Sequence, residues 1–199
     1  MSFEKTNFRL TGVRPLLMNS SAGMNPQNPL GQELKKLFAK RHKTEADDKR
    51  VAELDFLVKL YLMEVDGQLV PCVPGDNVEG MLVGTGGAVA NYKGLSKKKG
   101  MAGIISVGPF PLEYEGPKDP HELQQTEVFN FWCMVNQSGR RIYKVRPIFR
   151  EWAANVEVLH NPEVVDRDIL IYLMEYAGEM VGLMDWRPKY GAFTVEVLE

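Results

Sequence analysis

The sequence predicts an α+β fold with a split β-α-β core, and three observations support this fold class. Residues 3–17 alternate like a half-buried strand. A glycine-rich helix begins near Asp76 and is followed by an extended segment, and residues 141–199 read as strand, helix and strand. The resulting order, β-α-β and again β-α-β, is the ferredoxin-like arrangement, with two helices on one face of an antiparallel sheet. We expect a single domain over residues 1–199.

The first strand leads into the first of two expected insertions. Phe8 and Leu10 point to one side of the strand, while the polar residues between them point to the other. Residues 18–54 then carry a small polar loop and a segment with twelve charged residues in 23. A short apolar stripe there indicates helix, made of Leu34, Leu37 and Phe38. We expect an exposed, partly helical insertion.

The middle of the sequence predicts a hairpin, a helix, a loop and an edge strand. Asp66 and Gly67 suit the positive φ angles of a two-residue hairpin turn. Asp76 is expected to cap the following helix, whose glycines lower its helical propensity. Residues 93–103 read as a basic, glycine-flanked loop, and residues 104–116 as an edge strand interrupted by prolines.

The last third gives the clearest pattern. Residues 117–140 are expected as a second, loop-rich insertion, and residues 141–160 as one long strand whose first part is the third strand of the core. Asp166 is expected to cap a helix that ends at Gly182 in a left-handed stop, before a final strand. The predicted buried stripe of that helix consists of Leu170, Leu173, Met174, Ala177 and Met180.

Composition excludes several classes of protein. The net charge of −2 means that any basic surface must be local. Two separated cysteines, Cys72 and Cys133, and three scattered histidines predict neither a disulfide framework nor a metal site, and no cofactor motif is present. No apolar run is long enough to span a bilayer, and the first residues lack the apolar core of a signal peptide. These features predict a cytoplasmic location.

The basic segment at residues 140–152 is the first candidate for binding chemistry. In an extended chain Lys144, Arg146 and Arg150 share one face, where they could contact a phosphate backbone. The alternating residues expected beneath the helices are Tyr143, Val145 and Phe149. The alternative is a solvated strand face paired with acidic neighbours, which a chain with 26 acidic residues can supply.

Other segments allow both a functional and a structural interpretation. Lys97, Lys98 and Lys99 either follow phosphates or keep a loop soluble. The glycine-rich residues 80–89 lack the Lys-Ser/Thr pair of a phosphate-binding loop, so close helix packing is favoured. No nucleophile elbow, zinc-binding helix motif or close carboxylate pair occurs, which favours a binding protein over an enzyme.

Three segments together resemble the RAMP superfamily. Val73-Pro74-Gly75-Asp76 with Glu79-Gly80 is similar to the family's strand, turn and glycine-containing helix. Residues 8–24 resemble its first strand and small-residue loop, and residues 177–197 resemble its glycine-rich close, with matches at Gly182, Arg187, Gly191 and Phe193. The resemblance is to small RAMP-like proteins carried by phages and mobile elements, which are similar to CRISPR backbone subunits. It implies an RRM-like core, RNA binding through the glycine-rich loop and basic strand, and head-to-tail assembly along RNA.

The sequence therefore predicts a non-enzymatic protein that binds single-stranded RNA, with single-stranded DNA as an open alternative. The residues expected to contact nucleic acid are Lys97, Lys98, Lys99, Arg141, Lys144, Arg146, Arg150, Trp186, Arg187 and Lys189. One rival is a metal-dependent endoribonuclease using Asp47, Asp48 or His42. The other is a phage inhibitor that binds host CRISPR proteins.

Overall fold

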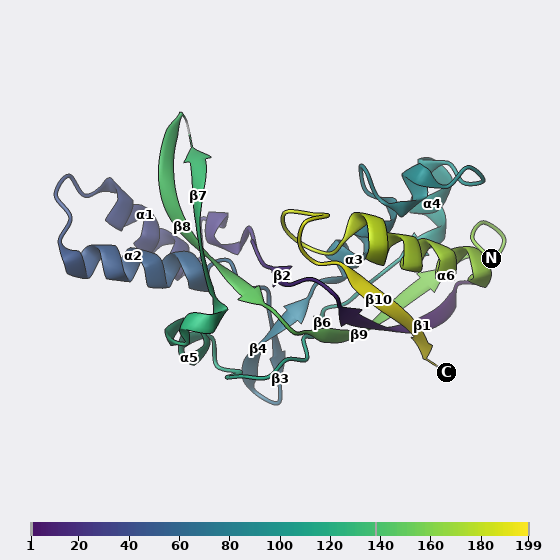
Figure 1. Cartoon of the computed structure of the whole chain (residues 1–199), viewed down its shortest axis with the longest axis horizontal. Helices are drawn as coiled ribbons and strands as arrows, with labels where there is room; N and C mark the ends of the chain where they lie inside the picture. Colours follow the sequence, from purple (N-terminus) through teal and green to yellow (C-terminus); the bar gives the residue numbers. More distant parts are fainter. Residues whose placement is uncertain (1, 138, 199) are drawn as a thin grey trace. The chain divides into compact units, whose positions relative to one another are not determined.

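The computed structural model describes residues 2–137 and 139–198, and the chain forms two compact units (Figure 1). The core unit comprises residues 1–16, 72–115 and 149–199. The inserted unit comprises residues 17–71 and 116–148. Both expected insertions, 18–54 and 117–140, therefore lie in the same unit.

The core unit contains a four-stranded antiparallel sheet. Its strands are β1 (Glu4–Gly12), β5 (Ile104–Ile105), β9 (Ala153–His160) and β10 (Phe193–Leu198). They lie side by side in the order β10-β1-β9-β5, which is fourth, first, third, second along the chain. With α3 (Gly75–Val83) after β1 and α6 (Arg167–Tyr176) after β9, this is the split β-α-β arrangement, and the α+β prediction is confirmed. β5 lies at the edge of the sheet, as its proline-interrupted segment predicts.

The apolar core lies between this sheet and its helices. Phe8 and Leu10 of β1 are fully buried, as predicted, beside Val156 and Val158 of β9. α6 packs on β10 and α3 on β5. Smaller elements complete the unit: η2 (Ala88–Asn91), α4 (Lys97–Gly103), β6 (Phe110–Pro111) and η4 (Ala177–Val181).

The long C-terminal helix confirms its predicted caps but not all of its buried face. Asp166 accepts a hydrogen bond from the N–H of Ile169, and Gly182 ends the helix at a φ of 78°. From residue 177 the helix continues as the π-helical turn η4, in which an N–H bonds to the carbonyl five rather than four residues earlier. This shift turns Met180 outward and buries Val181 instead, so the prediction for Met180 was wrong.

The third core strand also differs from the prediction. Residues 141–160 form two strands, β8 (Arg140–Phe149) and β9, separated at Arg150–Trp152. β9, not β8, pairs with β1, and β8 instead pairs with β7 (Asn130–Gln137). Both segments have apolar alternation, and pairing with β1 rather than local pattern decides which one joins the core sheet.

The inserted unit combines helices with two hairpins. Its elements are η1 (Ala22–Met24), α1 (Pro29–Ala39), α2 (Glu45–Leu57), β3 (Leu62–Val65), α5 (Pro120–Gln125), η3 (Glu127–Phe129) and β7. β4 (Gln68–Val73) pairs with β3 through Pro71, and its last two residues return to the core unit and pair with β6. β2 (Leu16–Leu17), where the chain enters this unit, precedes β8 and β7 in the sheet order β2-β8-β7.

Local sequence explains the helices and the first hairpin of this unit. Thr44 and Asp47 form a reciprocal capping box at the start of α2. Asp66 and Gly67 both have positive φ, as predicted for the hairpin turn. α1 and α2 pack through an apolar cluster of Leu34, Leu37, Leu54 and Val58.

Two local expectations for the core unit were wrong. The basic loop at residues 93–103 contains α4, because the Ser96 side chain accepts a hydrogen bond from the N–H of Lys99 and caps a helix. α3 begins after Pro74, so Asp76 lies in its first turn instead of capping it. A carboxylate there still favours the helix, since it faces the positive end of the helix dipole.

Candidate nucleic-acid interface

A groove in the inserted unit gathers aromatic and basic side chains. It has a volume of about 590 Å³ and is bordered by α1, α2 and the β7–β8 hairpin. Three aromatic residues line it and remain open to solvent: Phe38 is 45% exposed, Trp132 54% and Tyr143 69%. Exposed aromatic rings are the surfaces on which unpaired bases stack. We call this the aromatic groove.

Secondary structure explains why these rings converge. Leu37 faces the α1–α2 cluster, so Phe38 next to it on the helix turns away from that cluster. On the hairpin, Trp132 lies opposite Val145, and Tyr143 lies two residues before Val145 on β8. Trp132 and Tyr143 are therefore diagonal neighbours on one face, about 7–8 Å apart at their Cα atoms.

Two lysines stand at the aromatic groove. Lys144 Nζ lies 4.6 Å from the centre of the Phe38 ring, and Lys43 Nζ lies 5.2 Å from it. Both distances are within the range of cation–π attraction, which orients the ammonium groups without neutralising them. Phe38 thus holds two positive charges in the groove that Trp132 and Tyr143 also line.

A buried ionic cluster fixes Lys144 from below. The carboxylate of Asp55 accepts hydrogen bonds from Lys59 Nζ at 2.9 Å, Lys144 Nζ at 3.3 Å and the backbone N–H of Val145 at 3.2 Å. Lys59 Nζ also donates to the carbonyl of Val145 at 2.9 Å. Burial lowers the pKa of Lys59 and also that of Arg146, the residue after Val145 on β8. One carboxylate here faces three cations, so the cluster carries surplus positive charge.

Charge is distributed unevenly between the two units. The inserted unit contains 13 Lys and Arg against 11 Asp and Glu, whereas the core unit contains 11 against 15. The acids that line the aromatic groove are Asp48 and the neutralised Asp55. Because the chain as a whole carries a net charge of −2, any basic surface must be local, and the inserted unit has the positive surplus for one.

The structure divides the predicted contact residues between the units. Arg141, Lys144 and Arg146 lie on β8 of the inserted unit, and Lys144 alone of the ten lines the aromatic groove. The other seven belong to the core unit: Lys97, Lys98 and Lys99 on α4, Arg150 after β8, and Trp186, Arg187 and Lys189 in the closing turn.

The predicted alternation along β8 holds only in part. Val145 and Phe149 are buried, as expected, but Tyr143 is exposed and Arg146 is 9% exposed. The predictions of an inward Tyr143 and an outward Arg146 were therefore wrong. The reason is that β8 pairs with β7 in a hairpin instead of lying under the helices of the core sheet. Near the turn of the hairpin one face of β8 is open to solvent, whereas residues 145–149 are buried on both faces.

Backbone hydrogen bonds and close packing hold the closing turn of the core unit, residues 182–192, in place. Leu183 N–H donates to the carbonyl of Gly191, and Gly191 N–H donates to that of Pro15. A Cβ added at Gly191 would lie 2.0 Å from the carbonyl oxygen of Leu183, so close backbone approach requires glycine there. Trp186 packs near Tyr190 with ring centres 6.1 Å apart, and Lys189 lies over the same ring.

The open face of the core sheet carries mixed charge in ion pairs. Lys5 pairs with Glu157 at 3.2 Å, and Arg9 pairs with Glu113 at 2.7 Å and also donates to Asn155. The middle of this face therefore offers bound acids and amides where a base-stacking sheet would carry aromatic rings.

Two acids of α2 have structural partners. Asp47 accepts hydrogen bonds from Thr44 and pairs with Lys40 at 2.6 Å, and the Lys40 hydrogen bond lowers the pKa of Asp47. Asp55 is committed to the buried cluster. Across residues 2–137 and 139–198, no group of three or more His, Cys, Asp or Glu is placed to hold a metal ion.

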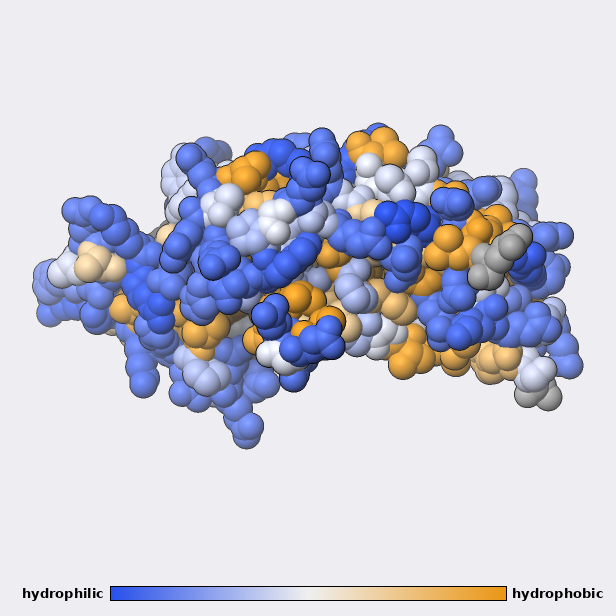
Figure 2. All heavy atoms as spheres, turned by 90° about the horizontal axis from the view of Figure 1, so that it is seen from below, coloured by the Kyte–Doolittle hydropathy of each residue, from blue (hydrophilic) through white to orange (hydrophobic). Residues whose placement is uncertain are grey.

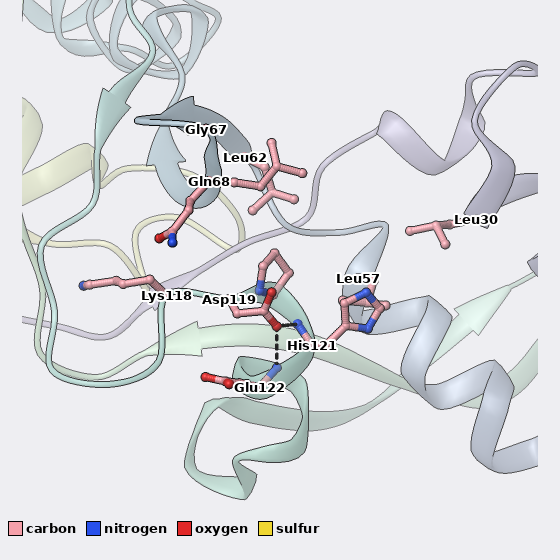
Figure 3. Close-up of a pocket in the computed structure, with 11 residues that line it drawn as sticks. Leu30, Leu57, Leu62, Gly67, Gln68, Lys118, Asp119, His121 and Glu122 are labelled. Carbon is pink, nitrogen blue, oxygen red and sulfur yellow. Dashed lines mark hydrogen bonds between the residues drawn. The ribbon is translucent and has the colours of Figure 1, made fainter.

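A second hollow in the inserted unit lies between the β3–β4 hairpin and α5 (Figure 3). Its volume is about 600 Å³, and Leu30, Leu57 and Leu62 form its apolar side. Asp119 is turned to the N–H groups of His121 and Glu122, which it caps. That carboxylate is therefore already engaged, and the described residues that line this hollow include no Phe, Tyr or Trp, in contrast to the aromatic groove.

Sequence reasoning missed the residues that define the aromatic groove. Phe38 was assigned to a buried stripe, Lys43 to a solvated helix, and Trp132 to a loop-rich insertion. The available signal was the aromatic segment at residues 128–135, because a short run rich in Phe, Trp and Val is typical of a strand.

Comparisons with known proteins add no family assignment. A scan against protein-family models and a search of curated proteins both found no match to this chain. Within the described residues, none of the helices combines the length and the apolar character needed to cross a bilayer. On the face shown in Figure 2, apolar residues form separate patches among hydrophilic ones.

Proposed function

We propose that this protein binds single-stranded RNA through the aromatic groove. The observation that carries the proposal is the placement of exposed Trp132 and Tyr143 beside Lys43 and Lys144 in one groove. Proteins that hold single strands combine cations that follow the phosphates with aromatic rings that stack on bases. The surplus positive charge of the inserted unit supports the same assignment.

The split β-α-β order supports the fold that the RAMP-superfamily resemblance implies. Many unrelated functions share this fold, so the order alone assigns none of them. RNA binding therefore rests on the groove, and membership of the superfamily remains a further proposal.

The test is binding of a labelled, unstructured RNA oligonucleotide by fluorescence anisotropy over a range of salt concentrations. Trp132→Ala and Tyr143→Ala should each weaken binding about tenfold, since stacking contributes about 1–3 kcal/mol per base. Lys43→Ala should also flatten the slope of log affinity against log salt by about 0.7. Tyr172→Ala, an exposed tyrosine of the core unit, is the matched control and should bind like the parent.

The same assay separates the alternatives. The triple replacement of Lys97, Lys98 and Lys99 by alanine reports whether α4 also contacts phosphate. A DNA oligonucleotide of the same sequence distinguishes a preference for RNA from general single-strand binding. Labelled RNA that keeps its full length after incubation with the protein and Mg²⁺ indicates binding without cleavage. Parent-like binding by both groove variants would overturn the proposal, and absence of any nucleic-acid binding would favour a protein partner.

A further inference from the structure

Strand β7 forms an edge without the features that normally keep strand edges apart. In the part of the chain that the structure describes, β8 neighbours β7 on one side and no strand neighbours it on the other. Its eight residues, Asn130–Gln137, include no charge, proline or glycine. Its register with β8 runs without a bulge from Asn130 opposite Pro147 to Gln137 opposite Arg140. Natural edge strands usually carry lysine, proline or a bulge, because open edges recruit other strands.

The exposed side chains on this edge strand are apolar. Trp132 and Met134 lie on one face, two residues apart, and are 54% and 50% exposed. An open edge with large apolar side chains gains both backbone hydrogen bonds and buried area when another strand pairs with it. A strand of similar length and complementary pattern would suit this edge.

The sequence of β7 is complementary to a second copy of itself running in the opposite direction. With Cys133 at the centre of an antiparallel pair, Trp132 falls opposite Met134, Phe131 opposite Val135, and Asn130 opposite Asn136. Apolar residues then meet in the middle and amides at both ends. Because the strand has no charge, two copies face no electrostatic repulsion along it.

We propose that β7 pairs in antiparallel register with β7 of a second copy of this chain, forming a two-fold symmetric dimer. The contact uses the same patch on both copies, and such an interface closes after two subunits. Two three-stranded sheets join into one across the paired edges. The ring of Trp132 lies against the thioether of the partner's Met134, a favourable sulfur–aromatic contact. The contact also uses Trp132, which lines the aromatic groove, so this side chain takes part in both proposed interactions.

The oligomeric state of nuclease-treated protein tests the proposal. Sedimentation equilibrium should give a mass approaching twice the 22.5 kDa of the chain, and Met134→Lys should raise the dimer dissociation constant about tenfold or more. Leu69→Lys is the matched control, because Leu69 is 52% exposed in the same unit but lies on β4. A monomeric parent at about 100 µM, or a Met134→Lys variant that dimerises like the parent, would overturn the proposal.

Disulfide formation between two variants tests the register itself. The two-fold axis places the native Cys133 opposite its own copy, so both variants are made in a Cys133→Ser background. There Trp132→Cys and Met134→Cys place thiols opposite each other across the two-fold axis, at about 4.5–5.5 Å between Cα atoms, which a disulfide can bridge. An equimolar mixture should form a covalent dimer under mild oxidation. Each variant alone places its thiols about 8 Å apart and should not. Equal cross-linking in the mixture and in the single variants would refute this register.

Discussion

Replacement of Asp55 by alanine should destabilise the inserted unit by about 3–5 kcal/mol. The side chain of Asp55 is 6% exposed and that of Lys59 is 11% exposed, so this ion pair is shielded from water. Its removal leaves the buried ammonium of Lys59 without a counter-charge and the N–H of Val145 without its acceptor. Lys144 is also released from its anchor beside the aromatic groove.

The pH dependence of the variant follows from Lys59. Burial already lowers the pKa of Lys59 below its ordinary value of 10.5, and Asp55 opposes that shift. Without Asp55 the folded-state pKa falls further, so between that value and 10.5 the unfolded chain binds more protons than the folded chain. Stability therefore rises with pH wherever this holds. The loss relative to the parent should be largest near neutral pH and smaller near pH 10.

Urea denaturation followed by circular dichroism at pH 7 and pH 9.5 measures both effects. Asp48→Ala, an acid of the same helix without an ion pair in the described structure, is the matched control and should change stability by less than about 0.5 kcal/mol. Adding Lys59→Met to Asp55→Ala should recover part of the loss, because the buried ammonium of Lys59 is then removed together with its counter-charge. A loss below about 1 kcal/mol for Asp55→Ala, or a loss that grows with pH, would refute the reasoning.

Three further predictions concern local features. Thr44→Ala removes the N-cap of α2 and should lower the free energy of unfolding, measured by urea denaturation, by about 1 kcal/mol. An unchanged denaturation midpoint would show that this cap does not stabilise the protein. Gly12→Ala places a Cβ 2.2 Å from Trp152 Nε1, so it should lower the free energy of unfolding by about 1–3 kcal/mol and shift the tryptophan emission. A thermal melt like that of the parent would contradict this packing. Burial raises the pKa of Cys72 to about 11 from 9.0. At pH 8 the thiolate fraction of Cys72, and its rate of reaction with a disulfide reagent, should therefore be about a hundredfold below those of an unburied thiol and should rise toward pH 11. Fast labelling at pH 8 would contradict this burial.

The elements that the sequence predicted well are those with local physical signals. The carboxylate of Asp166, the positive φ of Gly182 and the Asp66-Gly67 turn each depend on neighbouring residues, and each is present in the structure. The α+β order follows from the same signals combined. Such features can be read from short windows because their partners lie within four residues.

The features that could not be predicted depend on distant partners. Nothing near Arg146 shows that β8 leaves the core sheet, and nothing near Phe38 shows that Lys144, far along the chain, approaches its ring. The outward turn of Met180 follows from one π-helical turn. The candidate groove was missed because α1 and β7 come from two separate insertions that meet only in the folded unit.

The position of β1 between β9 and β10 has a consequence for synthesis of the protein. β1 ends at Gly12, yet its two neighbours begin at Ala153 and Phe193, so both of its edges lack their partners until the ribosome has added about 140 further residues. At roughly 5–20 residues per second that interval is on the order of ten seconds. During this time Phe8 and Leu10 cannot be buried against their partner strands, so we expect this strand to be bound by a chaperone.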